Sequence, residues 1–332
     1  MIDMISSQMG NTDGRTDRQT LAEVARLYYL QDVSKVDISA RLGVSRFKVA
    51  RLLDMAREQG VVTISIQGVA PVDPTASQEL SQHWGLNTVV VNSGHGTDSE
   101  VRRFVGQATA ELLMDNVHPG AAIGLSWGRT LRVMTDYLTR LPKVSVVQLI
   151  GAVTSDLDES PVELLRRTSL STGGKAYPII APAIFGDASA LAVLKTNPDV
   201  QAALDLFDHL DLAVIAVGSW DPPASQIRAV LGVEDRQLLD NIGVKAEVAG
   251  VFFDEDGNTV AEDFSARYLS ISASQLRRIP RVVAAAGGLI KLDAVRAVVK
   301  SGIITDLVTD HTLAEAALQG QPITPAISPD RT

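Results

Sequence analysis

The chain has 332 residues, a formal net charge of −9, 45% hydrophobic residues, 21% charged residues and no cysteine. Its length and composition are typical of a globular protein with one small and one large domain, not of a disordered chain. The absence of cysteine excludes disulfides, thiolate zinc sites and a cysteine nucleophile, and it fits a protein of the reducing cytoplasm.

The sequence carries no targeting or membrane signal that we recognise. The first twenty residues are polar and lack the apolar core of a signal peptide. The longest apolar stretch, residues 282–290, is too short to cross a bilayer. We therefore expect a cytoplasmic protein without a membrane partner.

The negative charge of the chain is unevenly distributed. Between Lys35 and Arg57 there are six basic residues and two acidic ones, a local excess of +4. Salt screens charges over about 10 Å, so a small basic face is sufficient to attract DNA phosphates. The acidic whole chain is therefore compatible with a nucleic-acid partner.

Three short helices are predicted after a polar tail, which we expect to span residues 1–17 and to be flexible. The first covers about 18–30 and has its apolar residues at helical spacing. These are Leu21, Val24, Ala25, Leu27 and Tyr28. Ser34 is a suitable cap for the second helix, over about 35–42, which has four apolar residues available to pack inward. They are Val36, Ile38, Ala40 and Leu42.

The third helix is predicted from Ser45, its cap, to about residue 59. Gly43 supplies a tight turn before it, and Gly60 ends it. The β-branched run 61–66 that follows is suited to a strand of a wing. This order predicts a winged helix-turn-helix over residues 18–67, in which the start of the third helix enters the major groove of DNA.

The candidate DNA-contacting residues lie mostly at the start of this third helix. Arg46 is suited to read guanine edges, while Lys48, Arg51 and the Ser45 hydroxyl are suited to phosphates or bases. Phe47 is open to two interpretations, contact with a thymine methyl or packing within its own domain. The DNA-binding set is Lys35, Ser45, Arg46, Phe47, Lys48 and Arg51. The alternative is a solvated three-helix module whose basic face has no role.

The opposite side of the third helix is predicted to be core, at Val49, Leu52 and Leu53. A linker with glycine and prolines is expected over 68–76, an α/β domain over 77–320, and a C-terminal tail over 321–332.

The larger domain alternates apolar runs with helical segments. Its candidate strands are 88–91, 121–125, 144–150, 212–217, 282–286 and 307–309. Helices are expected between them, for instance over 99–114, 129–141 and 291–300. Strands that are apolar on both faces predict a parallel, doubly wound sheet. Residues 252–257 together with 267–271 are expected to form a hairpin or excursion added to this sheet.

Several separated motifs resemble the SorC family of bacterial sugar-operon regulators. The N-terminal match is 21–66, centred on 37–46, and those in the larger domain are 124–131, 250–257, 286–288 with Lys291, and 309–310. The resemblance implies a sugar-isomerase-like effector domain, a sugar, polyol or sugar-phosphate ligand, no other cofactor, and homodimers or homotetramers. One departure is Ala246-Glu247, where the family more often has Gly-Asp, so the ligand of better-known members does not transfer directly.

Ligands of open α/β sheets bind at the carboxyl ends of strands, so the loops that follow the strands are candidate ligand sites. In 124–130, backbone N–H groups and two hydroxyls are suited to hold phosphate or sugar hydroxyls, unless the segment is only a tight turn. Lys291 is suited to bind a phosphate as a point charge, or else is a cation on the surface. Asp310 is suited to accept hydrogen bonds from ligand hydroxyls, or else to cap the last helix. The effector set is Gly124, Ser126, Trp127, Gly128, Arg129, Thr130, Gly218, Ser219, Glu247, Gly287, Gly288, Lys291 and Asp310.

Two enzyme interpretations remain as alternatives. The spacing Gly124-x-Ser126-x-Gly128 also occurs in the nucleophile elbow of serine hydrolases, with Asp254 and His311 as available partners. Sugar-phosphate isomerase chemistry is the other, although no acid/base pair stands out. Neither explains a fused DNA-binding module, so we expect no catalytic residue; no metal-ligand cluster or Walker-type loop is found in the sequence either.

Overall fold

The computed structural model describes residues 18–62, 71–94, 96–152 and 160–326. The chain divides into two compact units, residues 1–68 and 69–332. None of the helices within these ranges combines the length and the apolar character that a membrane span requires.

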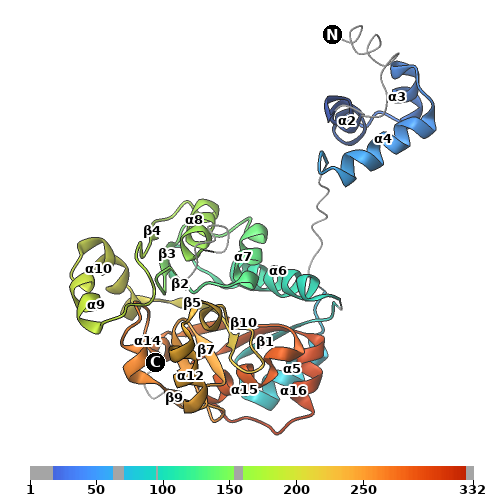
Figure 1. Ribbon diagram of the computed structural model, residues 1–332. Helices are drawn as coiled ribbons and strands as arrows, with labels where there is room; N and C mark the ends of the chain where they lie inside the picture. The colour runs from blue at the N-terminus through green and yellow to red at the C-terminus, as the bar shows by residue number, and fades with distance from the viewer. Residues whose placement is uncertain (1–17, 63–70, 95, 153–159, 327–332) are drawn as a thin grey trace. The chain divides into compact units, whose positions relative to one another are not determined.

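The N-terminal unit consists of short helices joined by tight turns (Figure 1). They are α2 (Arg18–Ala25), the π-helical turn η1 (Arg26–Leu30), α3 (Lys35–Leu42) and α4 (Arg46–Glu58). The hydroxyl oxygen of Ser34 accepts the N–H of Asp37 at 3.2 Å, which caps α3. Gly43 ends α3 at φ 63°, where a side chain would be strained. The expected wing strand falls largely on residues 63–66, outside the described residues.

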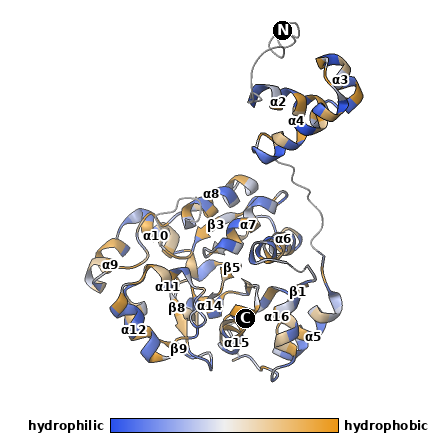
Figure 2. Ribbon diagram, turned by 45° about the vertical axis from the view of Figure 1, so that its right-hand side comes forward, coloured by the Kyte–Doolittle hydropathy of each residue, from blue (hydrophilic) through white to orange (hydrophobic). Residues whose placement is uncertain are grey.

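One small core holds these helices together. Its buried residues are Leu21, Val24, Ala25, Leu27, Ile38, Val49, Leu52, Leu53 and Ala56. The inward faces predicted for the first and third helices are therefore confirmed, and Figure 2 shows helix α4 with both hydrophobic and hydrophilic residues. The prediction for α3 is wrong in part, because Val36 is 57% exposed and Ala40 is exposed. A helix of eight residues has few positions facing the core, and here Ile38 is the only buried one.

The C-terminal unit is built on a seven-stranded sheet whose strands pair in parallel. The strands are β1 (Thr88–Asn92), β2 (Ala122–Leu125), β3 (Ser145–Gln148), β4 (Ala176–Tyr177), β5 (Leu212–Ala216), β10 (Arg281–Ala285) and β11 (Asp306–Asp310). Their order across the sheet is β1-β11-β10-β5-β2-β3-β4. This confirms the predicted doubly wound α/β class; β4, with two residues, was too short for the sequence to reveal.

Helices connect the strands and cover the sheet (Figure 1). They are α5 (Pro74–Trp84), α6 (Asp98–Asn116), α7 (Arg129–Tyr137), α8 (Pro161–Thr172), α9 (Ala188–Lys195), α10 (Pro198–Leu204), α11 (Gln226–Val230), α12 (Val233–Ile242), α13 (Glu262–Ser265), α14 (Ala273–Arg278), α15 (Leu292–Lys300) and α16 (His311–Leu318), with 3-10 turns η2 (Phe207–His209) and η3 (Leu289–Lys291).

Successive residues of one strand enter different cores, as the period of two requires. In β10, Val282 and Ala284 join one core with α5, α15 and α16, whereas Val283 and Ala285 join the other with α6, α7 and α8. Both faces of the sheet are thus buried, which explains why its strands are apolar at nearly every position.

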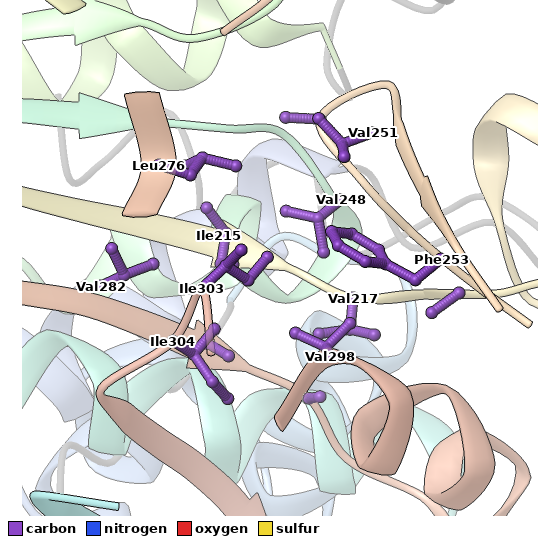
Figure 3. Close-up of a cluster of buried hydrophobic side chains, with 14 of the residues drawn as sticks. Ile215, Val217, Val248, Val251, Phe253, Leu276, Val282, Val298, Ile303 and Ile304 are labelled. Carbon is purple, nitrogen blue, oxygen red and sulfur yellow. The ribbon is translucent and has the colours of Figure 1, made fainter. Parts of the chain in front are cut away.

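A second, antiparallel sheet adds to the larger core. It runs in the order β6 (Gly218–Ser219), β7 (Ala246–Val248), β8 (Val251–Phe253) and β9 (Thr259–Val260). Figure 3 shows Val248, Val251 and Phe253 of this sheet among Ile215 and Val298 of the main layers. Residues 267–271 are not part of it: they bridge to Ile150 and Ile184 instead. The expected hairpin between 252–257 and 267–271 is therefore wrong, whereas the alternative, an excursion added to the sheet, agrees with the place of Phe252 and Phe253 in this second sheet.

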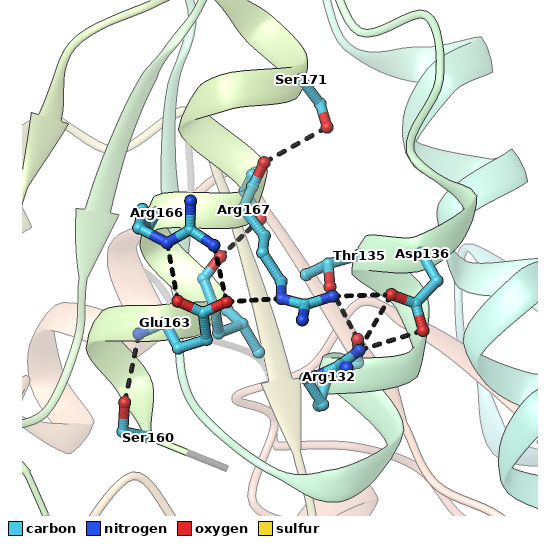
Figure 4. A network of polar contacts seen from close by, with 10 residues as sticks. Arg132, Thr135, Asp136, Ser160, Glu163, Arg166, Arg167 and Ser171 are labelled. Carbon is cyan, nitrogen blue, oxygen red and sulfur yellow. Dashed lines mark hydrogen bonds and ion pairs between the residues drawn. The ribbon is translucent and has the colours of Figure 1, made fainter. Parts of the chain in front are cut away.

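Helices α7 and α8 are joined by a network of charged side chains (Figure 4). Glu163 accepts hydrogen bonds from Arg166 Nε at 2.7 Å and from Arg167 Nε at 2.7 Å. Arg167 Nη1 also contacts Asp136 at 2.9 Å, and Asp136 is bound by Arg132. The two helices therefore share one chain of ion pairs across their contact.

Two segments expected to be unstructured contain ordered residues. Helix α5 begins at Pro74, within the expected linker 68–76. Ile323, in the expected C-terminal tail, is buried, and its N–H donates to the carbonyl of His83 at 2.9 Å. The domain limits named from the sequence stay predictions.

Candidate functional site

The start of helix α4 presents a basic surface to solvent. Ser45 caps the helix, since its hydroxyl oxygen accepts the N–H of Lys48 at 3.2 Å. The burial of Val49 and the residues beyond it fixes which side of α4 faces the core. Arg46, Phe47, Lys48 and Arg51 are consequently exposed.

The cations at this end of α4 are not paired with acidic side chains of the described residues. Within residues 18–62, Arg46, Lys48 and Arg51 form no ion pair, whereas Arg57 near the other end of the helix is paired with Asp54. Lys35 differs from them, because it is half-buried with its Nζ 5.3 Å from the centroid of the Tyr28 ring. The three free cations have the chemistry of a phosphate- and base-contacting surface.

The largest group of predicted effector residues meets at a cavity of about 210 Å³ in the C-terminal unit. The cavity lies beyond the carboxyl ends of β2, β5 and β10. Eight predicted residues line it: Trp127, Gly128, Arg129, Thr130, Gly218, Glu247, Gly287 and Lys291. Residues from three strand-end loops that are far apart in the sequence are thereby brought together.

Two glycines keep the cavity open. A Cβ on Gly128 would lie 2.8 Å from the Cβ of Ala216, and its φ of 149° is unfavourable for other residues. A Cβ on Gly218 would lie 2.6 Å from Oε2 of Glu247. Larger residues at either position would therefore collide with the lining of the cavity.

Glu247 is a buried carboxylate in this lining. Its Oε1 accepts the N–H of Gly250 at 3.0 Å, and its Oε2 accepts the hydroxyl of Ser225 at 3.1 Å. Burial raises the pKa of Glu247, although both hydrogen bonds act in the opposite direction. It projects from β7 beside the tight turn of Ala249 and Gly250, whose φ angles are 49° and 82°. That turn also brings Ala249 into the lining.

Lys291 supplies a cation to the same cavity. Its Nζ donates to the carbonyl of Val217 at 2.7 Å. Burial, followed by the charge of Arg129, lowers the pKa of Lys291 to about 8, while Glu247 opposes this shift. The ammonium group is thus held between positive and negative neighbours, where an anionic ligand would offset its desolvation.

Five predicted residues do not line the cavity. Gly124 lies inside β2 against Leu149 and Leu210, and Gly288 N donates to Asp310 Oδ1 at 2.6 Å. Ser219 Oγ donates to the carbonyl of Ile290 at 3.3 Å.

The sequence left two roles open for Asp310, and its contacts are those of a helix cap. Its Oδ2 accepts the N–H groups of Thr312 at 3.1 Å and Leu313 at 3.3 Å, at the start of α16. Both of its carboxylate oxygens therefore have backbone donors, and the side chain is buried.

The side chain of Ser126 is likewise hydrogen-bonded to the backbone. Its buried hydroxyl oxygen accepts the N–H of Ala216 at 3.0 Å. The side chain of Asp254 binds the N–H groups of Asp256 and Asn258. His311, the histidine considered as a base, lies 3.1 Å from Glu315. Within the described residues, the hydrogen bonds of Ser126 are to backbone groups and none joins it to a histidine.

Other residues, not predicted from the sequence, also line the cavity, and two of them, Asp98 and Arg102, are charged. Both lie in the first two turns of α6, which follows the carboxyl end of β1. The strand-end rule that selected the other loops applies to this one as well. Gln226 at the start of α11 also lines the cavity, and no sequence signal identified it. No cluster of potential metal ligands occurs among the described residues.

Comparisons with known proteins cover nearly the whole chain. A model of the family described as "Putative sugar-binding domain" matches residues 73–319. The sorbitol operon regulator of Klebsiella pneumoniae is 29% identical over 329 residues, covering 94% of this chain and 100% of that protein. The erythritol catabolism regulatory protein EryD of Brucella abortus (strain 2308) is 27% identical over 311 residues, covering 92% and 98%. Similarity to the crystal structure of full-length SorC from Klebsiella pneumoniae has a TM-score of 0.68 at 27% identity, covering 91% and 99%.

Proposed function

Because the chain belongs to the SorC family of sugar-binding transcriptional regulators, we propose that it controls a carbohydrate or polyol catabolic operon through operator DNA and a small effector. The DNA-contacting residues are Lys35, Ser45, Arg46, Phe47, Lys48 and Arg51. The effector is a sugar, polyol or sugar phosphate, and it binds in the 210 Å³ cavity.

The observation that carries this proposal is the charge arrangement of the cavity. Arg102, Arg129 and Lys291 contribute positive charge, and Asp98 and the buried Glu247 contribute acceptors. A ligand with an anionic group and several hydroxyls satisfies both kinds of partner. Glycine-lined loops allow backbone N–H groups to approach it.

The proposal includes a regulatory mechanism without catalysis. A homodimer or homotetramer places two copies of α4 on successive major-groove faces of a pseudo-palindromic operator. Effector binding favours one arrangement of the subunits and thereby changes operator affinity. The protein acts in the cytoplasm and uses no cofactor besides the effector.

A ligand screen tests the effector half. The full chain is heated with a panel of sugars, polyols and their phosphates, and a specific ligand raises the Tm by mass action. We expect a phosphorylated compound to do so, and Lys291→Met to abolish the shift without lowering the ligand-free Tm, since it removes a cation that is costly to bury. If unphosphorylated compounds alone raised the Tm, the phosphate role of Lys291 would be wrong.

The competing enzyme proposal has a direct test. Incubation of the full chain with each compound that raises the Tm should return it unchanged. Isomerisation of a sugar phosphate would support the isomerase alternative, and ester hydrolysis abolished by Ser126→Ala would support the hydrolase.

A further inference from the structure

The side chain of Phe47 is the most exposed large hydrophobic group among the described residues, with 88% of its surface accessible. It occupies the second position of α4, directly after Arg46 and before Lys48. The core of the unit is already filled by Val49, Leu52 and Leu53 from the same helix. Of the two interpretations left open by the sequence, packing within its own domain is therefore wrong.

The surroundings of Phe47 define what kind of partner it can meet. Arg46, Lys48 and Arg51 are exposed on the same end of α4 and have no ion-pair partner in the described part of the N-terminal unit. A partner of this surface must be predominantly anionic and yet offer an apolar group to the phenyl ring. A second protein surface with a hydrophobic centre would leave the three cations unneutralised unless it were acidic.

The major groove of DNA combines both properties. Phosphates line its edges, and the C5-methyl group of thymine is the apolar group displayed on its floor. The N-terminal residues of a recognition helix are the ones that reach base edges. Resting on the proposed DNA-binding function, we infer that Phe47 is a specificity-determining residue, which contacts the methyl groups of thymines in the operator.

This assignment separates the tasks of neighbouring side chains. The cations attract the phosphate backbone of any duplex, whereas the phenyl ring gains an apolar contact only where a methyl group is present, at one or two positions of each half-site. The ring gains nothing from uracil, which has the same hydrogen-bonding groups as thymine without the methyl.

The test uses a duplex that the full chain selects from a random-sequence library. Each thymine in its half-sites is replaced singly by deoxyuridine, and affinity is measured at one fixed salt concentration. We expect one or two positions at which the replacement weakens wild-type binding about three- to tenfold. Phe47→Ala should bind the thymine duplex as weakly as the wild type binds the uracil one, and should be indifferent to the replacement.

Leu30→Ala is the matched control, because Leu30 is also strongly exposed, at 78%, in the same unit. This variant should keep the wild-type response to deoxyuridine. A 5-methylcytosine paired with guanine restores the methyl group at the sensitive position. The wild type should bind this duplex more tightly than the deoxyuridine duplex, whereas Phe47→Ala should show no such gain.

The possible failures are distinguishable. If the wild type tolerated deoxyuridine at every position, or if Phe47→Ala kept the same sensitivity, the inference about Phe47 would be wrong while DNA binding stood. If the full chain enriched no sequence at all, the proposed function itself would fail. Equal Tm values for wild type and Phe47→Ala would exclude unfolding as the cause of a weaker complex.

Discussion

At the scale of single residues, Lys291 and Glu247 show how the fold prepares charged groups for a ligand. Both side chains reach one cavity from different elements, the start of α15 and the strand β7. Burial disfavours the charged form of each, so it lowers the pKa of Lys291 and raises that of Glu247. A ligand that pairs with these groups recovers part of the cost of burying them.

Lys291 predicts a pH dependence of effector binding. Its pKa of about 8 means that the ammonium group loses its proton as the pH rises through that value. We expect the affinity for a phosphorylated effector to fall about tenfold between pH 7 and pH 9.5. Isothermal titration at several pH values measures this, and Lys291→Met should give weak binding without the pH dependence.

The other groups facing Lys291 are Arg129, Glu247, Arg102 and Asp98. Glu247→Gln removes an acid whose charge raises the pKa of Lys291, so the transition should persist but move to a lower pH. A flat profile for the wild type would contradict the prediction.

Lys291 also affects stability, with a sign that follows from its pKa. An unfolded lysine has a pKa of 10.5, so between pH 8 and 10.5 the unfolded chain binds a proton that the folded chain does not. The free energy of unfolding therefore gains a contribution that grows as the pH rises through this window. An effector phosphate works against this trend because it favours the charged lysine.

At the scale of elements, Glu163 of α8 holds the arginine that reaches across to Asp136 of α7. Glu163 is 19% exposed and holds both Arg166 and Arg167. These two guanidinium groups lower the pKa of Glu163 to about 2. Because its folded pKa lies below the unfolded value of 4.5, its contribution is full above pH 4.5 and is lost as the pH falls towards 2.

We therefore predict that Glu163→Gln lowers the free energy of unfolding by about 1–2 kcal/mol at pH 7, after allowance for the partly exposed arginines. Urea denaturation at pH 7 and at pH 3 measures the difference, which should shrink at the lower pH. Asp115→Asn is the control, since the Asp115–Arg140 pair is 63% and 68% exposed. A loss for Asp115→Asn as large as that for Glu163→Gln would contradict the special role of the network.

Helix α4, the proposed recognition helix, gives a second prediction for an element. Arg46→Ala should relax the preference for a guanine in the selected duplex, at a cost of about 1–3 kcal/mol for the preferred sequence. Lys48→Ala and Arg51→Ala should instead weaken all duplexes similarly and reduce the slope of log affinity against log salt by about 1. Arg57→Ala is the control, because Arg57 is already paired with Asp54.

Binding measurements over a set of single-base variants and salt concentrations separate these effects. Unchanged binding by Arg46→Ala, Lys48→Ala and Arg51→Ala together would show that another surface contacts DNA.

Local signals at helix ends explain why the helices of the N-terminal unit were predictable. Ser34, Gly43 and Ser45 act over three or four residues, and such local signals are readable from one sequence. Val36 was misassigned because a three-dimensional core, not helical spacing, decides which apolar residue of a short helix is buried. The strands of the sheet were found because burial on both faces leaves continuous apolar runs, as in β10.

The cavity depended on information that is not local. Lys291 and Gly128 were selected because each follows a strand, but the same rule selected Ser126 and Asp310, whose polar atoms bind backbone groups instead. Gln226 comes from a helix after the antiparallel sheet, and only the folded chain brings it to the cavity. A shift of one residue at the end of a strand decides whether a side chain faces the ligand or the opposite side. The sequence pattern does not resolve such a shift.

At the scale of the whole molecule, the proposed function requires that two distinct sites in one chain influence each other. Residues of the effector cavity lie in the unit 69–332, and α4 lies in the unit 1–68. If the effector changes operator affinity by some factor, thermodynamic linkage requires that operator DNA change effector affinity by the same factor. The coupling of such systems is typically about 5- to 150-fold.

We predict this reciprocity for the full chain. Affinity for the selected duplex is measured with and without a saturating effector, and affinity for the effector with and without the duplex, at one salt concentration. The two ratios should agree. A lower operator affinity in the presence of the effector would mean that the effector releases the protein from DNA, and a higher one that it promotes DNA binding. Lys291→Met should bind the duplex as the wild type does and lose the response to the effector. Phe47→Ala should do the reverse, with weaker duplex binding and unchanged effector affinity in the absence of DNA. A wild-type ratio of 1 in both directions would mean that the cavity ligand does not regulate DNA binding, even if each site binds its partner.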